Sequence, residues 1–298
     1  MSKTSIAYQS SPFHLTNEQQ YQSWKADKLQ NYPQSISELI VPIKNPFQLE
    51  SNELAQLKQL LSKTNMAIYA LSSTDFSQKS IPEVIGHQLG IRQLDKNECA
   101  DNDSFTSIQV MQNGLHNTYI PYSNKPLNWH TDGYYNKLNE QIYSMVLHCV
   151  RNASVGGVNQ LLDFEIVYLL LRDQNPDYIQ ALMAKDAMLI PKNVLAGKLV
   201  RPDRPGPVFS ITENGRLHMR YTARARNVIW KDNKITQAAQ NSIRDILNSS
   251  SPFHFQADLK PGQGLICNNI LHTRSTFVDD KENPRLLYRG RYLDKMNF

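Results

Sequence analysis

From about residue 104 onward, the chain is divided into short segments rich in β-branched and aromatic residues. Turn signals such as Gly156-Gly157, ENG at 213–215 and PGQG at 261–264 separate these segments. Several such segments within one stretch are typical of antiparallel strands in a sandwich, jelly roll or barrel. The segments are SFTSIQVM, QIYSMVLHCV, VNQLLD, PVFSI, RLHMRYTA, FHFQADL, GLICNNILH and RLLYRGRYL.

Helical periodicity is found in fewer places. Leucines at helical spacing predict a helix over 51–63, with Ser51 as its N-cap, followed by a strand over 66–71. A short helix is expected over SIPEVIGHQLG, two helices joined at Asn175-Pro176 over 164–186, and one more over 234–247. We expect a single catalytic domain spanning 1–298. Residues 1–50, polar and irregular at 1–45, form its arm or lid, and 51–298 form its core.

Composition limits the class of protein. The chain has 298 residues, 40% of them hydrophobic, and a formal net charge of +5 with no Lys/Arg run of five. A packed globular interior is expected, with small-molecule partners and neither nucleic acid nor a membrane. Cys99, Cys149 and Cys267 are widely spaced, with no CxxC, and the segment MSKTSIAYQSSPFHL lacks the apolar stretch expected of a signal peptide. These features predict buried thiols and a cytoplasmic protein; a homo-oligomer stays open.

The segment NWHTDGYYN at 128–136 contains His130 and Asp132, two residues apart. In an extended segment, side chains at i and i+2 point to the same face, so both can bind one ion. A third ligand from another strand would complete a 2-His-1-carboxylate set, which suits non-haem Fe(II). His272, at the end of GLICNNILH, is favoured over the remaining candidates, His148, His218 and His254. A polar turn and a zinc hydrolase site are the alternatives.

A second feature is the strand RLLYRGRYL, in which Arg285, Arg289 and Arg291 share one face. Arginines placed together in this way repel one another unless anions lie between them, and a guanidinium is well shaped to bind a carboxylate. The alternative for Arg285 is a structural ion pair with Asp279, Asp280 or Glu282.

Four motifs in order, WHTDGYY, LHCVRNASVGG, NNILHTRSTF and RLLYRGRY, resemble the taurine dioxygenase and γ-butyrobetaine hydroxylase group of Fe(II)/2-oxoglutarate oxygenases. The resemblance covers roughly residues 50–294 and implies a mainly β fold with flanking helices and a double-stranded β-helix core, a cupin-like jelly roll. It implies that His130, Asp132 and His272 bind iron and that Arg285 binds 2-oxoglutarate, with O2 as the second cosubstrate. The family's usual Ser or Thr contact to the cosubstrate falls at Asn159, whose amide can donate the same hydrogen bond.

The resemblance also implies substrate residues. Arg289 stands where taurine dioxygenase-like members bind the substrate's anion, whereas Tyr122 fits one wall of the aromatic cage of γ-butyrobetaine hydroxylases. The strand near residues 104–110 offers Phe105 but no tryptophan for that cage. Tyr134 is expected in the pocket wall, and Arg220, with Arg224 and Arg226, near the pocket. We expect hydroxylation of a small anionic or zwitterionic carboxylate, sulfonate or phosphonate, with release of succinate and CO2. The alternatives are a quaternary-ammonium acid as substrate, or a non-catalytic binding protein on the same fold.

Overall fold

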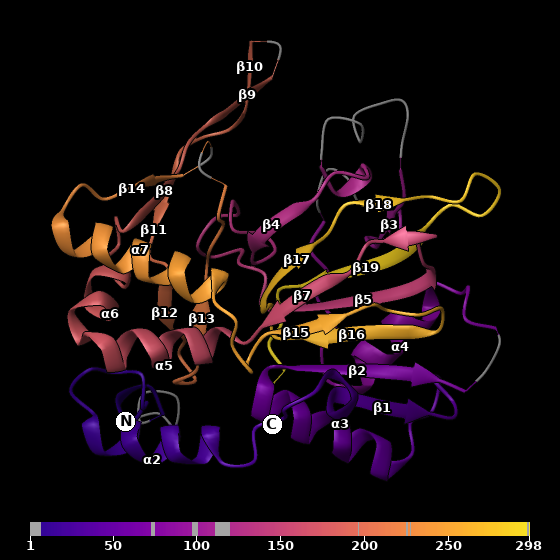
Figure 1. The fold of residues 1–298 in the computed structure, drawn as a ribbon, viewed down its shortest axis with the longest axis horizontal. Helices are drawn as coiled ribbons and strands as arrows, with labels where there is room; N and C mark the ends of the chain where they lie inside the picture. The colour runs from indigo at the N-terminus through magenta and orange to yellow at the C-terminus, as the bar shows by residue number, and fades with distance from the viewer. Residues whose placement is uncertain are drawn as a thin grey trace. The chain divides into compact units, whose positions relative to one another are not determined.

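The computed structural model describes residues 7–72, 75–96, 101–110, 120–195, 197–224, 226, 228–296 and 298 (Figure 1). The chain divides into two compact units and passes between them several times. Unit 1 comprises Met1–Tyr32, Trp129–Gln141 and Leu162–Phe253, and unit 2 comprises Pro33–Asn128, Ile142–Leu161 and His254–Phe298. That all 298 residues act as one catalytic domain stays a prediction.

Two sheets organise the strands of unit 2. The larger has the order β1-β2-β16-β5-β19-β3 and the smaller has the order β15-β7-β17-β4. The larger contains β1 (Ile40–Ile43), β2 (Met66–Leu71), β16 (Gln263–Cys267), β5 (Ser144–Arg151), β19 (Leu286–Tyr292) and β3 (Thr106–Ile108). The smaller contains β15 (Phe255–Ala257), β7 (Asn159–Leu162), β17 (Leu271–Arg274) and β4 (Leu127–His130), and β6 (Val155–Gly156) pairs with β18 (Phe277–Val278).

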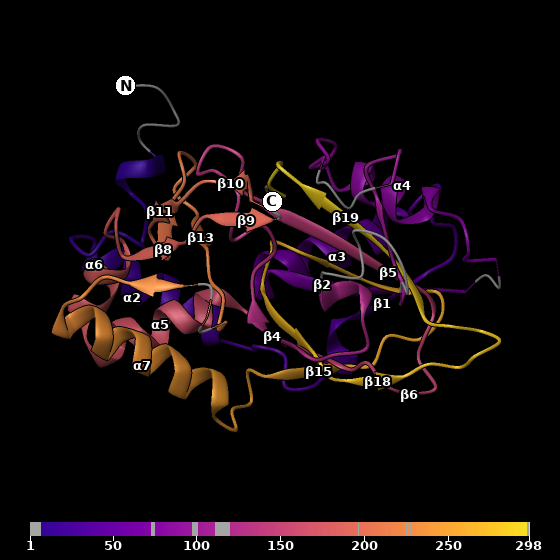
Figure 2. The same ribbon diagram turned by 90° about the horizontal axis from the view of Figure 1, so that it is seen from above.

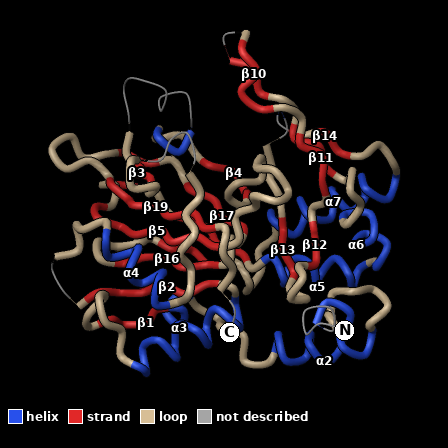
Figure 3. The backbone as a smooth tube through the Cα atoms, turned by 180° about the vertical axis from the view of Figure 1, so that it is seen from behind, coloured by secondary structure: helices blue, strands red, loops and turns tan. Residues whose placement is uncertain are grey.

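The path of the chain between these sheets defines the fold. It passes from β4 in the smaller sheet to β5 in the larger, back to β7 and β15, and again from β16 to β17 and on to β19. Strands that alternate between two sheets in this way, with antiparallel neighbours, form a double-stranded β-helix. The expectation of a cupin-like jelly-roll core is confirmed, and Figure 3 shows the stacked strands from behind.

The hydrophobic core of unit 2 lies between the larger sheet and two helices, α3 (Ser51–Thr64) and α4 (Ser80–Gln88) (Figure 2). Leu57 and Leu61 of α3 and Ile81 and Ile85 of α4 are fully buried, as the leucine spacing of the sequence predicts. Burying a side chain of this size contributes about 1.5–3 kcal/mol. The large sheet is therefore held rigidly on its helical side.

Three local expectations were wrong. GLICNNILH is two strands, because Asn269 adopts a left-handed φ of 52° between β16 and β17 and the chain changes sheet there. The stretch 1–45 is not irregular throughout, since β1 pairs in parallel with β2, and Pro42 is accommodated because β1 is an edge strand. The N-cap of α3 is Glu50, in a reciprocal capping box with Glu53, rather than Ser51.

Unit 1 is built from helices and short strands. Its helices are α2 (Glu18–Leu29), α5 (Phe164–Gln174), α6 (Pro176–Leu182) and α7 (Lys234–Asn248). The side chains of Asp163 and Asn175 cap α5 and α6, so the two helices predicted over 164–186 are confirmed. Its strands are β8 (Met188–Ile190), β9 (Asn193–Leu195), β10 (Lys198–Arg201), β11 (Arg204–Gly206), β12 (Phe209–Ile211), β13 (Leu217–Met219) and β14 (Ile229–Trp230).

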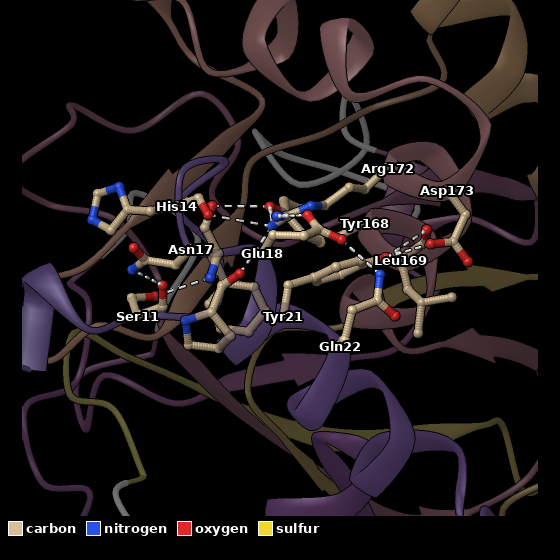
Figure 4. A network of polar contacts seen from close by, with 12 residues as sticks. Ser11, His14, Asn17, Glu18, Tyr21, Gln22, Tyr168, Leu169, Arg172 and Asp173 are labelled. Atoms are coloured by element: carbon tan, nitrogen blue, oxygen red, sulfur yellow. Dashed lines mark hydrogen bonds and ion pairs between the residues drawn. The ribbon is translucent and has the colours of Figure 1, made fainter.

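Two buried polar clusters fix the N-terminal segment to α5. In the first, Arg172 is 3% exposed and donates to the carbonyls of Pro12 and His14, while it also pairs with Glu18 (Figure 4). The guanidinium lies 3.8 Å from the ring centroid of Tyr21. These contacts describe an arm packed on α5, and its movement as a lid stays a prediction.

The second cluster surrounds Lys28, which is 4% exposed. Its ammonium lies 2.6 Å from Asp163 Oδ2 and 2.5 Å from Glu165 Oε2, and the hydroxyl of Tyr32 donates to Asp163 at 3.4 Å. Two carboxylates share one buried cation, so the cluster carries a surplus negative charge. Burial raises the pKa of Asp163 to about 6, against the opposing effect of Lys28.

Candidate metal centre

His130 is the last residue of β4, and the backbone around it is held tightly. His130 forms a bridge with Thr222, and the amide of Thr131 donates to the carbonyl of Tyr221 at 3.0 Å. A turn follows over residues 132–135, with a φ of +65° at Gly133. Asp132 lies in that turn, so the extended segment expected for both residues ends at His130, although their side chains still lie close together.

The side chains of His130 and Asp132 lie side by side. His130 Nε2 is 3.6 Å from Asp132 Oδ1, which is longer than a hydrogen bond, and the two side chains are 12% and 4% exposed. A buried carboxylate requires compensation by a cation or by hydrogen bonds. An imidazole nitrogen and a carboxylate oxygen at this separation form two adjacent donors to one ion.

His272 lies on β17 and is 7% exposed. Its Nδ1 is 3.0 Å from the carbonyl oxygen of Ile270. Since a carbonyl only accepts, Nδ1 carries the proton, and the lone pair on Nε2 is left for a ligand. Metal-binding histidines are oriented in this manner, with the second nitrogen bonded to a carbonyl or carboxylate.

The structure brings the three residues together. One ligand atom from each of His130, Asp132 and His272 lies within 4.8 Å of the others. The proximity follows from the smaller sheet, in which β4 and β17 are neighbours. By contrast, His148 is buried in β5, where it is bonded to the hydroxyl of Tyr69 at 2.9 Å and to the carbonyl of Phe76 at 2.7 Å, and so packs in the core as expected.

Arg285 lies just before β19 and is 5% exposed, with Gly157 and Phe277 as its neighbours. A Cβ added to Gly157, whose φ is +73°, would lie 3.3 Å from Arg285 Nε, and the guanidinium lies 5.1 Å from the ring centroid of Phe277. Asp279 accepts the backbone amide of Arg285 at 2.6 Å. Within the part of the chain that the structure describes, no ion pair joins the guanidinium to an acidic side chain, and burial lowers the pKa of Arg285.

Asn159 lies on β7 and is 6% exposed. Its amide nitrogen donates to the carbonyl of Thr273 at 2.8 Å, next to His272. One of its two amide hydrogens is therefore engaged in joining β7 to β17. The amide nitrogen carries a second hydrogen, so the predicted contact to a cosubstrate stays a prediction.

The predicted substrate residues fall into different surroundings. Arg289 lies on β19 opposite Leu147 of β5 and is 9% exposed, while its neighbour Arg291 is ion-paired with Asp95. Tyr122 is 2% exposed, in the short helix η3 (Ile120–Tyr122). Of the three arginines expected to repel one another on one strand, Arg291 is thus neutralised within the protein.

The tyrosine and arginine expected in the pocket both lie in unit 1. Tyr134 is 9% exposed and makes an edge contact with Tyr135 at 5.2 Å between ring centroids. Arg220 is 2% exposed, and its guanidinium donates to the carbonyls of Met188 at 2.7 Å and Arg204 at 3.2 Å. Burial lowers the pKa of Arg220 to about 10. These carbonyls give Arg220 a structural role in joining short strands.

The remaining residues near the expected pocket separate clearly. Arg224 and Arg226 are exposed, whereas Arg220 is buried. Phe105 is 1% exposed and belongs to the hydrophobic core of unit 2, so it is not available for an aromatic cage.

Among the described residues, no helix is both long and apolar enough to cross a membrane. Cys149 and Cys267 are buried, and Cys99 lies outside the described residues.

Arg274 is a residue that the sequence analysis missed. It lies two residues after His272 on β17 and is 3% exposed, although the sequence suggests that a polar loop begins there. The spacing of two from a ligand on a strand was the signal that could have identified it.

Comparison with known proteins decides the family. The model of the family described as "Taurine catabolism dioxygenase TauD, TfdA family" matches residues 27–291. The chain belongs to the TauD, TfdA dioxygenase family. Two relatives, each 29% identical to this chain over the matched residues, are named uridine-5'-phosphate dioxygenase. The protein from Amycolatopsis sp is 29% identical over 171 residues, which are 56% of this chain and 60% of the relative.

The second relative, from Streptomyces sp, is 29% identical over 195 residues, which are 64% of this chain and 70% of the relative. The chain thus matches three fifths of the length of the Amycolatopsis protein. Solved structures are more distant in sequence but similar in fold. The non-heme iron oxygenase OrfP in complex with Fe, succinate and (3R,4R)-dihydroxy-L-Arg is 14% identical with a TM-score of 0.60, covering 82% of this chain and 81% of that one.

Asparagine oxygenase in complex with Fe(II), 2S,3S-3-hydroxyasparagine and succinate gives a TM-score of 0.54 at 12% identity, with 81% of this chain and 78% of that chain covered. At these identities the likeness concerns the fold. The TauD, TfdA family and the jelly-roll architecture therefore agree with each other.

Proposed function

We propose that this protein is an Fe(II)/2-oxoglutarate-dependent dioxygenase whose iron is held by His130, Asp132 and His272. The single observation that carries the proposal is the grouping of their ligand atoms within 4.8 Å of one another. Two imidazole nitrogens and one carboxylate oxygen suit Fe(II) and leave coordination positions for a cosubstrate and O2. The hydrogen bond from His272 to Ile270 supports the fit, because it leaves Nε2 available.

Arg285 is the residue we assign to the carboxylate of 2-oxoglutarate that lies away from the keto group. Its guanidinium is buried and unpaired with any described acidic side chain, so an incoming carboxylate would supply its counter-charge. Hydrogen bonds between charged partners contribute about 1.5–3 kcal/mol. The second amide hydrogen of Asn159 is assigned to the same cosubstrate.

When bound, Fe(II) and 2-oxoglutarate supply the oxidising chemistry with O2, with release of succinate and CO2. The chain's own residues hold these groups in place. Asp132 gives a negative charge that offsets part of the metal's charge, and His272 is fixed in one tautomer. Arg285 orients the cosubstrate through its planar donors.

The substrate we propose is a small anionic or zwitterionic metabolite, with Arg289 as the residue that binds its anionic group. The names of two relatives, uridine-5'-phosphate dioxygenase, support a phosphate-bearing substrate, whereas asparagine oxygenase supports an amino acid. A quaternary-ammonium substrate is less well supported, because Phe105 lies in the core. The free buried thiols Cys149 and Cys267 support a cytoplasmic location.

The test is anaerobic addition of Fe(II) and then 2-oxoglutarate, with the visible charge-transfer band as the readout. Succinate release is next measured with uridine-5'-phosphate, L-asparagine and L-arginine as separate substrates. A band and coupled succinate release support the proposal. Hydrolysis with Zn2+ in the absence of O2 would instead identify the zinc hydrolase alternative. If no band and no succinate were observed, the remaining alternative would be a non-catalytic binding protein.

Arg289→Ala tests the substrate assignment separately. If Arg289 binds the substrate, product formation falls while uncoupled consumption of 2-oxoglutarate continues. Equal losses of both would place Arg289 at the cosubstrate instead.

A further inference from the structure

We propose that Arg274 is a positioning residue of the metal centre, which holds the approach to β4 against β17 through four backbone carbonyls. The proposal rests on the proposed function, because β4 ends at His130 and β17 carries His272. In this proposal, Arg274 binds neither metal nor cosubstrate but fixes the strands that carry the proposed ligands His130 and His272.

The contacts of Arg274 define this role. Its Nη1 donates to the carbonyl of Pro121 at 3.0 Å, and its Nη2 lies within 3.4 Å of three more carbonyl oxygens. Those three belong to Ile120 at 3.4 Å, Ser123 at 2.7 Å and Lys125 at 2.5 Å. The six residues from 120 to 125, which include these four carbonyls, end two positions before β4 begins. The side chain of Arg274 therefore binds the segment 120–125, which leads into β4, at four of its carbonyls.

A second tie holds the same segment. The hydroxyl of Thr276 donates to the carbonyl of Asn124 at 2.9 Å, and the amide of Phe277 donates to that carbonyl at 3.3 Å. Both donors lie within three residues of Arg274 along the chain. The segment 120–125 is thus bonded from one side by residues 274–277, and the largest share of these bonds comes from Arg274.

The charge surroundings show that Arg274 is not a site for an anion. Although no acidic side chain within the described part of the chain pairs with it, backbone carbonyl oxygens already occupy its outer nitrogens. A carboxylate brought to these nitrogens would face the negative ends of the same carbonyls. Burial, and then the charges of Arg285 and Arg289, lower the pKa of Arg274 to about 9.

Arg274 and Arg285 therefore differ in function although both lie near Phe277, at 5.0 and 5.1 Å from its ring centroid. Among the described residues, the guanidinium of Arg285 contacts no carbonyl or carboxylate and can bind a ligand, whereas the two outer nitrogens of Arg274 are engaged by backbone carbonyls. The structure assigns the first to a ligand and the second to the scaffold. Residues that orient metal ligands typically affect metal affinity by about 10–100-fold.

The experiment uses the full chain without metal and Co(II) as the probe, followed by the visible absorption of bound Co(II). Arg274→Lys keeps the charge but loses the planar fork, and Arg274→Met loses both. We expect both variants to weaken Co(II) binding by about 10–100-fold. If only Arg274→Met did so, the effect would come from charge and the positioning role would be overturned.

Arg172→Met is the matched control. Arg172 is equally buried, at 3% exposed, and also donates to backbone carbonyls, but it lies in the polar cluster beside α5 (Figure 4). We expect this variant to lower Tm and to leave the Co(II) affinity unchanged. An equal loss of Co(II) affinity in Arg172→Met would show a general effect of stability and overturn the proposal.

Two further variants complete the test. Thr276→Val removes one hydrogen bond to the segment 120–125 with little risk to folding, and it should also weaken Co(II) binding. If the Arg274 variants do not fold, an unchanged Co(II) affinity of Thr276→Val overturns the proposal. His272→Ala separates the two proposals. If it binds Co(II) like the wild type, the proposed metal site fails, whereas normal binding by Arg274→Lys alone overturns only the positioning role.

Discussion

The imidazole Nδ1 of His272 donates to the carbonyl of Ile270, two residues before it, at 3.0 Å. This bond lies at the point where the chain leaves the larger sheet and enters the smaller one, just after the left-handed Asn269. The same crossing that forms the jelly roll therefore also orients the proposed metal ligand His272. A ring fixed in one tautomer is ready to bind without rearrangement.

His272→Ala should abolish the charge-transfer band of the Fe(II) and 2-oxoglutarate complex. Removing a ligand costs more than the roughly 10–100-fold loss of metal affinity associated with residues that only support ligands. The measurement is an anaerobic Fe(II) titration in the presence of 2-oxoglutarate. His87→Ala, on α4, is the control and should keep the band. A band of normal intensity in His272→Ala would exclude this residue as a ligand.

Arg285→Lys should raise the KM for 2-oxoglutarate with little change in the affinity for Fe(II). Loss of a charge-assisted pair of about 1.5–3 kcal/mol corresponds to about 10–150-fold in KM. The guanidinium is buried and has no described acidic partner, so the cosubstrate loses a contact that water cannot replace well. Initial rates of succinate formation at varied 2-oxoglutarate give the value. An unchanged KM would return Arg285 to a structural role.

Gly157→Ala should raise the same KM through the position of Arg285. The new methyl group would lie 3.3 Å from Arg285 Nε, in addition to the strain of φ +73°. Gly197→Ala is the control, since φ is +78° there and nothing lies within 4 Å of the added Cβ. Both variants should lose about 1–2 kcal/mol of stability from the left-handed backbone. Only Gly157→Ala should alter the KM, and an equal rise in Gly197→Ala would contradict the role of crowding.

Asp163→Asn should change how stability depends on pH. Burial raises the pKa of Asp163 from 3.8 to about 6, so the folded protein holds a proton that the unfolded chain releases. This contribution is complete below pH 3.8 and is lost as the pH rises through about 6. The wild type should therefore lose stability relative to Asp163→Asn across this window and not above it. Denaturant unfolding at several pH values measures the difference, and parallel curves would contradict the shift.

Much of the fold was predictable from local patterns. The leucines of α3 and the apolar stripe of α7 follow helical spacing, and the Asn175-Pro176 pair marks the break between α5 and α6. The strand β2 has the bounds expected from its composition. Such features depend on residues close in the chain, so sequence alone contains them.

The errors occurred where tertiary contacts decide. The crossing at Asn269 lies within GLICNNILH, whose apolar residues continue on both sides of Asn268-Asn269, and a left-handed residue leaves no periodic signal. Pro42 and its neighbours form β1 only because β2 provides a partner. The burial of Arg220 and Arg274 on backbone carbonyls also depends on distant segments, and their chemistry alone suggests ligand binding. For His130 and Asp132, a spacing of two was sufficient although β4 ends at His130, because Asp132 in the turn that follows still lies beside the imidazole.

The position of β16 between β2 and β5 has a consequence for biosynthesis. The two outer partners leave the ribosome long before β16 does, so the large sheet stays open at its centre until residues 263–267 appear. His272 follows within the next few residues. The joining of β2 to β5 through β16 and the synthesis of His272, the last of the proposed iron ligands, would then be nearly simultaneous, and only β19, between β5 and β3, would still have to follow.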